Sequence, residues 1–239
     1  MTILFKKAYR EVAALVSKIY VGGLPVRYRG YTLIAPMVHG IRNGGYYIEC
    51  EDFMLNCLRD AVNSNPESKV LDVGANVGLL LTQLRSFNDN THYYGVEPNV
   101  GNCFFCNTLI EKNSFPNSWV YPVALGAENN LAKLTLKKSK KGDPGAYVSG
   151  YSVNKPNDDR YHELPINLMK GDDFVNMAGL DNISFIKIDV EGNECEVISG
   201  LSEVIETHRP DIFCEVAPES APRATARTDQ SHILGAIQA

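Results

Sequence analysis

The sequence lacks the long apolar run of a membrane-spanning helix, since no stretch of about 18 consecutive apolar residues occurs among its 239 residues. Its N-terminus also lacks the apolar stretch and small-residue cleavage site of a secretory signal. With 23 basic and 28 acidic residues, it has no basic surplus of the kind that nucleic-acid binders carry. We therefore expect a soluble globular protein that is cytoplasmic by default, with no transmembrane segment and no nucleic-acid partner.

Cysteine is sparse, and its spacing does not form a metal motif. Cys103 and Cys106 make a lone C-x-x-C, but no second pair or nearby histidine pair completes a zinc site. Their neighbours Phe104 and Phe105 indicate the buried face of a helix. We expect reduced thiols that pack as small apolar side chains.

The first 49 residues differ in pattern from the rest. Residues 3–20 combine apolar side chains at helical spacing with a basic opposite face, which predicts an amphipathic helix. This helix either packs against its own domain or makes peripheral contact with an anionic membrane. Residues 21–45 are rich in Gly, Pro, Arg and Tyr and predict short strands and turns. We expect an N-terminal extension, 1–49, followed by one domain, 50–239.

From residue 51 onward, segments with helical spacing alternate with short apolar runs. The runs at 70–74, 92–98, 119–125, 183–190 and 211–217 predict strands. Helices are predicted at 53–62, 76–87, 99–113 and 193–208. Such alternation predicts an α/β fold, a mainly parallel sheet with helices on both faces, whose ligands bind beyond the carboxyl ends of the strands.

The ends of the first two strands carry the residues of a nucleoside site. "DVGANVG", residues 72–78, has the glycines that let a backbone turn tightly and approach a ligand. Glu97 ends the next strand, where an acid can hold both ribose hydroxyls. The dinucleotide pattern G-x-G-x-x-G is broken, because Asn76 and Leu79 occupy two of its glycine positions, and no P-loop motif occurs. A nicotinamide-dependent oxidoreductase is therefore the weaker alternative.

Six segments in order carry a family resemblance: "VLDVGANVG", "YYGVEPN", "VALG", "GDDFV", "FIKIDVEGNECEVISG" and "RPDIFCEV". Over residues 51–216 the chain resembles the FkbM-type S-adenosylmethionine-dependent methyltransferases. The resemblance implies a Rossmann-like class I methyltransferase fold, S-adenosyl-L-methionine as cofactor, and O-methylation of a hydroxyl, here expected on a saccharide or glycoconjugate. It also implies the residues of the cofactor site: Asp72, Gly74, Ala75, Asn76 and Gly78 on the methionine side, Glu97 at the ribose, and Asn99, Ala124 and Leu125 near the adenosine.

Two features depart from the family. Gly171 stands where a leucine usually precedes the acidic pair of "GDDFV". A complete fold of this class continues after its fifth strand with a helix and an antiparallel strand pair, but residues 228–239 read as the opening of that helix alone. We expect the last antiparallel strands to be missing, which would expose a sheet edge and favour an oligomer.

The acidic turn after the fourth strand is the predicted catalytic centre. Asp189 ends that strand, and Glu191 follows where Gly192 permits close backbone approach. We predict that Asp189 is the general base or the anchor of the acceptor hydroxyl, assisted by Glu191. Glu194 and Glu196 are interpreted as first-turn helix charges.

Three alternatives stay open. Glu215 ends the fifth strand and could share a divalent cation such as Mg²⁺ with the acidic turn, although no metal ligand set can be named. The connection over 137–165, with its lysines and tyrosines, is either a lid over the acceptor or a solvated loop. The chain could also be a non-catalytic or truncated nucleoside-binding module.

Overall fold

The computed structural model describes residues 23–28, 30–36, 52–64, 67–138, 145–149 and 159–215. The amphipathic helix predicted at 3–20, the membrane contact considered for it, and the helix predicted near the C-terminus lie outside these ranges. Among the helices within the ranges, none combines the length and apolar character needed to cross a bilayer.

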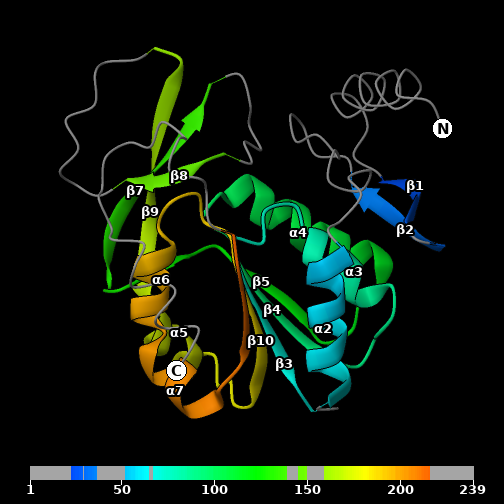
Figure 1. Cartoon of the computed structure of the whole chain (residues 1–239). Coiled ribbons are helices and arrows are strands. Elements are labelled where there is room, and N and C mark those ends of the chain that lie inside the picture. Colours follow the sequence, from blue (N-terminus) through cyan, green and yellow to red (C-terminus); the bar gives the residue numbers. More distant parts are fainter. Residues whose placement is uncertain are drawn as a thin grey trace.

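A five-stranded parallel sheet forms the centre of the molecule (Figure 1). Its strand order is β11-β10-β3-β4-β5, and all neighbouring pairs run parallel. Both faces of such a sheet are covered, so its strands are mostly apolar. The strands are β3 (Lys69–Val73), β4 (His92–Val96), β5 (Ser118–Tyr121), β10 (Ile183–Ile188) and β11 (Asp211–Cys214).

Helices cover both faces of this sheet, as predicted, and each face has its own core. Val70 and Phe185 point to the face covered by α2, α3 and α4, whereas Leu71 and Ile186 point to α5, α6 and α7. Neighbouring residues enter different cores because side chains alternate along a strand. The helices are α2 (Asp52–Ser64), α3 (Leu79–Arg85), α4 (Val100–Asn113), α5 (Gly171–Met177), α6 (Glu194–Gly200) and α7 (Ser202–His208).

The single helix predicted at 193–208 is instead two helices, α6 and α7, divided at the buried Leu201. Gly171, the departure from the family pattern, packs against this joint. A Cβ at Gly171 would lie 2.5 Å from Leu201 Cγ and 3.0 Å from the Gly200 carbonyl oxygen. No side chain fits at position 171. The close passage of the chain from β9 (Tyr161–Lys170) into α5 therefore requires glycine there.

A second sheet lies beside the first, with strand order β6-β9-β7-β8. It contains β6 (Ala124–Gly126), β7 (Asn130–Lys137), β8 (Tyr147–Ser149) and β9, with β7 antiparallel to both β8 and β9. The strand predicted over 119–125 was therefore wrong in extent. It breaks at Pro122, which has no backbone N–H to donate, so the chain leaves the central sheet there and β6 joins the second sheet.

The N-terminal strands form an antiparallel hairpin, β1 (Gly23–Tyr28) and β2 (Tyr31–Pro36), that packs against α4. The Asn113 side chain accepts a hydrogen bond from the Ile34 N–H at 2.6 Å and donates one to the Ile34 carbonyl oxygen at 2.9 Å. Val26 and Leu33 belong to the same core as α2, α3 and α4. The predicted domain boundary at residues 49 and 50 stays a prediction, because residues 37–51 lie outside the described ranges.

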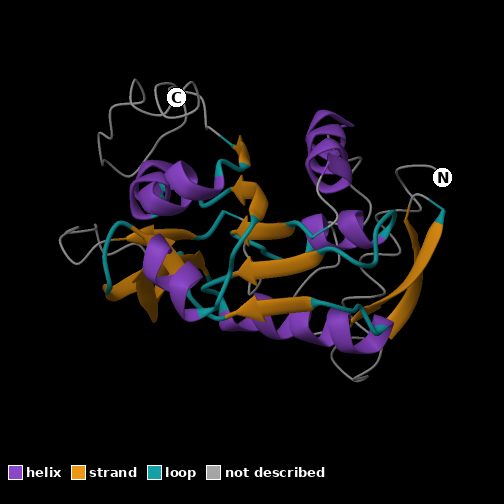
Figure 2. Ribbon diagram, turned by 90° about the horizontal axis from the view of Figure 1, so that it is seen from below, coloured by secondary structure: helices purple, strands orange, loops and turns teal. Residues whose placement is uncertain are grey.

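The far edge of the central sheet, within the described residues, is β11. Residues 216–239 lie beyond the description, so the predicted absence of the last strands and the predicted oligomer stay predictions. Figure 2 views the molecule from below, with helices above and below the strands of the sheet.

Candidate active site

The glycine loop after β3 has the backbone that its sequence predicts. Gly74 has φ 84°, Asn76 φ 50° and Gly78 φ 75°. A Cβ at Gly74 would collide with the carbonyl oxygen of Asp189, so only glycine brings the loop this close to the acidic turn. The N–H groups of Gly74 and Ala75 both donate to the Val96 carbonyl oxygen, at 3.0 and 3.1 Å. The loop is therefore hydrogen-bonded to the end of β4 and lies close against the end of β10.

Glu97 closes this loop from the end of β4. Its Oε2 accepts the Asn76 N–H and its Oε1 accepts the Asn99 N–H, each at 2.8 Å. The residue is only 6% exposed, and burial raises the pKa of its carboxyl to about 7 even though both hydrogen bonds act in the opposite direction. Each oxygen can accept a further hydrogen bond, so Glu97 can receive two donors from a ligand.

The acidic turn stands on the other side of the loop. The Asp189 N–H donates to the Val73 carbonyl oxygen at 3.0 Å, which continues the pairing of β10 with β3. Glu191 has φ 56° and Gly192 φ 107°, an uncommon pair of left-handed residues that redirects the chain into α6. The Gly192 N–H donates to Glu194 Oε1 at 2.8 Å, and Glu194 is buried. Glu194 thus braces the turn, a role beyond the helix charge predicted for it.

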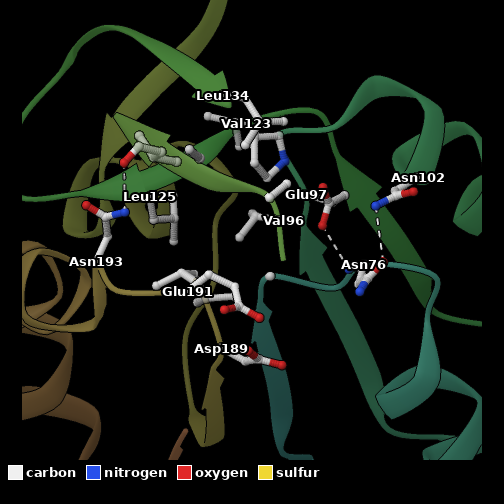
Figure 3. Close-up of a pocket in the computed structure, with 17 residues that line it drawn as sticks. Asn76, Val96, Glu97, Asn102, Val123, Leu125, Leu134, Asp189, Glu191 and Asn193 are labelled. Atoms are coloured by element: carbon white, nitrogen blue, oxygen red, sulfur yellow. Dashed lines mark hydrogen bonds between the residues drawn. The ribbon is translucent and has the colours of Figure 1, made fainter. Parts of the chain in front are cut away.

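These segments surround one pocket with an empty volume of about 610 Å³, part of it open to solvent (Figure 3). The structure brings together seven of the predicted site residues in its lining: Gly74, Asn76, Glu97, Ala124, Leu125, Asp189 and Glu191. The pocket also lies against β7 and β8, so the second sheet forms its outer wall through Leu134, Ala146 and Val148.

Four predicted residues do not line this pocket. Asp72 is 1% exposed and lies beneath the loop. Ala75 is buried, and Gly78 begins α3, where a Cβ would approach Leu109. Asn99 caps α4, because its side-chain oxygen accepts the Gly101 N–H at 3.0 Å.

The structure adds residues that sequence reasoning missed. Asn102 of α4 lines the pocket and donates to Asn76 Oδ1 at 3.1 Å, and Asn193 donates to the Val148 carbonyl oxygen at 3.1 Å (Figure 3). Neither pair lies near in sequence, so no local pattern could reveal it. Lys187 is different: a lysine inside the apolar run 185–188 was a visible signal.

Lys187 forms ion pairs with both predicted aspartates. Its Nζ lies 3.1 Å from Asp189 Oδ2 and 3.5 Å from Asp72 Oδ1. Burial lowers the pKa of Lys187, but the two carboxylates together outweigh it, so that its pKa is raised and the side chain is cationic. Burial likewise raises the pKa of the Asp72 carboxyl, which Lys187 and the Tyr93 hydroxyl partly counteract.

Cys103 and Cys106 lie buried on α4, as predicted, and are free thiols. Burial raises the pKa of Cys103 to about 11, so it remains a protonated thiol. In the part of the chain that is described, no three His, Cys, Asp or Glu side chains are grouped so as to hold a metal ion. Asp189, Glu191 and Glu215 therefore lend no support to the divalent cation considered above.

A parallel α/β sheet whose glycine loop, buried acid and acidic turn share one pocket is the arrangement of an S-adenosylmethionine-dependent methyltransferase. The family model described as the methyltransferase FkbM domain matches residues 72–234, more than half of the chain. The chain belongs to this family, and it is a methyltransferase.

Individual relatives are distant. "Methyltransferase 1" of Beauveria bassiana (strain ARSEF 2860) is 21% identical over 193 residues, which cover 76% of this chain and 77% of that protein. The N-terminal domain of EvdMO1, solved in the presence of SAH and D-fucose, is 11% identical with a TM-score of 0.42, covering 98% of this chain and 85% of that one. A proposed caffeoyl-CoA O-methyltransferase from Staphylococcus aureus is 10% identical with a TM-score of 0.39, and the match covers 66% of this chain and only 54% of that protein.

Proposed function

We propose that this methyltransferase transfers the methyl group of S-adenosyl-L-methionine to a hydroxyl of a small-molecule acceptor, in particular a saccharide or glycoconjugate. The observation that carries the proposal is that Asp189 and Glu191 line the same pocket as Gly74, Asn76 and Glu97. Two carboxylates at the edge of a cofactor pocket suit an acceptor whose proton must be removed during the reaction.

The chain's own residues fit the cofactor. Glu97 has an oxygen lone pair free on each side for a ribose hydroxyl, since each oxygen accepts one backbone N–H. Gly74 and Asn76 form the backbone at which the methionine end would lie, and Ala124 and Leu125 offer an apolar surface for the adenine. When bound, the cofactor supplies an electrophilic methyl group on a sulfonium.

Asp189 would hold the acceptor hydroxyl and take its proton. The acceptor oxygen would accept the methyl group of the bound cofactor, whose sulfonium would become a neutral thioether, so the hydroxyl proton is what this chain's residues have to remove. The hydroxyl proton goes to the Asp189 carboxylate, a contribution of about 10²- to 10⁴-fold for a positioned base. Glu191, exposed on its strained turn, would contact the acceptor beside this hydroxyl.

The test uses the full chain with S-adenosylmethionine carrying a labelled methyl group and a panel of mono- and oligosaccharides. We expect label in an acid- and base-stable ether, and calorimetric binding of S-adenosylmethionine but not of NAD. Asp189→Asn should lose about 10²-fold or more in turnover with little change in cofactor affinity. Transfer to nitrogen or carbon acceptors alone would contradict hydroxyl methylation, and full turnover by Asp189→Asn would contradict the role of Asp189.

A further inference from the structure

Lys187 places a cation inside the mostly apolar strand β10. Its side chain is 13% exposed, and besides the two aspartates it donates to the Gly74 carbonyl oxygen at 3.3 Å. Burying an ammonium group is unfavourable unless its partners compensate. Its three oxygen partners come from the core, the glycine loop and the acidic turn, so Lys187 joins all three.

The inner partner of Lys187 is fixed. Lys187 and Asp72 are directly paired in the register of β10 and β3. The Tyr93 hydroxyl donates to Asp72 Oδ2 at 2.5 Å, and a Cβ at Gly95 would come within 3.1 Å of that hydroxyl. Asp72, which is buried, is therefore held by Tyr93 on one side and Lys187 on the other.

The outer partner is the one that needs holding. The Asp189 side chain is 32% exposed and lines the pocket, and a carboxylate in that setting can adopt several rotamers. The main-chain bond from Asp189 to Val73 fixes its backbone and leaves its side chain free to rotate. The ion pair with Lys187 restricts that rotation from beneath.

We propose that Lys187 is a positioning residue, whose ion pair with Asp189 keeps that carboxylate aimed into the pocket. This inference rests on the proposed function of Asp189. The reaction needs the acceptor oxygen in line with the methyl group, and a displacement of about 1 Å can cost about 10²-fold in rate.

A different role for Lys187 would be to balance the buried charge of Asp72 and nothing more. Lys187→Met alone cannot separate the two roles, because it leaves Asp72 uncompensated and destabilises the fold. The comparison is therefore made in an Asp72→Asn background, where Asp189 is the remaining carboxylate partner of Lys187. Asp72→Asn is compared with Asp72→Asn/Lys187→Met, and Lys133→Met, which removes an exposed lysine paired with Glu163, serves as the control.

Two readouts decide the matter. With the acceptor that the wild-type chain methylates, kcat of the double variant should be about 10- to 100-fold below that of Asp72→Asn, at similar melting temperatures. In crystals, Asp189 should keep one rotamer in Asp72→Asn and occupy several in the double variant. Equal kcat or an unchanged single rotamer would overturn the proposal. A wild-type chain that methylates no hydroxyl would instead overturn the proposed function, and the crystal readout would still decide whether Lys187 orients Asp189.

Discussion

Two buried cations lie at opposite ends of the central sheet, and their partners differ in kind. Arg85, at the end where β4 and β5 begin, is 2% exposed and donates hydrogen bonds to neutral oxygens. Lys187, toward the carboxyl ends of the strands, pairs with two carboxylates. Arg85 links turns of the chain to one another, and Lys187 holds charged side chains beside the pocket.

The partners of Arg85 show what its end of the sheet requires. They are carbonyl oxygens at the two turns that lead into β4 and β5, together with the Ser118 hydroxyl, at 2.8–3.3 Å. Burial lowers the pKa of Arg85 to about 10, which leaves it charged at neutral pH. Turns without secondary-structure partners need donors, and one guanidinium supplies several. Arg85 fills this end of the sheet with hydrogen bonds inside the chain, whereas the pocket lies at the opposite end. We therefore expect the residues of this end to govern stability and those of the opposite end to govern binding.

The largest effect should follow from Arg85→Ala. The change removes the guanidinium donor from the buried Thr91 carbonyl oxygen and from the Ser118 hydroxyl and opens a cavity, so we expect a loss on the order of 4 kcal/mol in the free energy of unfolding. Chemical denaturation measures it. Arg59→Ala, which removes a cation lying 5.1 Å above the Phe87 ring, is the control and should cost about 1 kcal/mol or less. Equal losses in the two variants would refute the contrast between the ends of the sheet.

The next effect concerns the glycine loop. Gly74 and Gly179 both have positive φ, 84° and 64°, but a Cβ at Gly179 meets nothing within 4 Å, whereas one at Gly74 meets Asp189. Gly179→Ala should cost about 1 kcal/mol for its backbone alone, and Gly74→Ala about 1–3 kcal/mol more. Only Gly74→Ala should weaken S-adenosylmethionine binding. Thermal unfolding measures the stability losses, and calorimetry measures S-adenosylmethionine binding. If the two variants behaved alike in both, the cost would be that of the backbone conformation alone, and the contact of Gly74 with Asp189 would have no role.

A smaller effect is expected at Glu97. In Glu97→Gln one carboxylate oxygen becomes an NH₂ group that faces the N–H of Asn76 or Asn99 instead of accepting it. Loss of a charged hydrogen-bond acceptor costs about 1.5–3 kcal/mol, which corresponds to roughly 10- to 100-fold in affinity for S-adenosylmethionine. Calorimetry checks this, with Glu128→Gln as an exposed control. Undiminished affinity would remove Glu97 from the cofactor site.

Sequence patterns were sufficient where the physics is local. Apolar runs marked the strand that contains Asp72 and the strand that ends before Asp189, and the glycines of 72–78 predicted a tight turn, which the structure contains. What escaped prediction depends on distant partners. Pro122 gave a local sign that the run 119–125 would divide, but the second sheet that receives β6 is assembled from strands up to residue 170. Arg85 lies in the last turn of α3, and no local pattern marks its role, since its carbonyl partners lie up to 32 residues away.

The titration of Glu97 separates its role in cofactor binding from its effect on stability. As the pH rises, its contribution to stability should fall, whereas the affinity for the cofactor should rise. Its pKa is raised to about 7, so the stability attributable to it is fully present below about 4.5 and is lost as the pH rises through about 7. Ribose hydroxyls donate to the ionised form, so cofactor affinity should instead rise with pH through this window, by up to about tenfold per unit below 7. Binding at pH 6 should release a proton, which calorimetry in buffers of different ionisation enthalpy detects.

Glu97→Gln retains the other titrating groups, so the difference between its profile of affinity against pH and that of the wild type belongs to Glu97. Parallel profiles would mean that the carboxylate does not meet the cofactor.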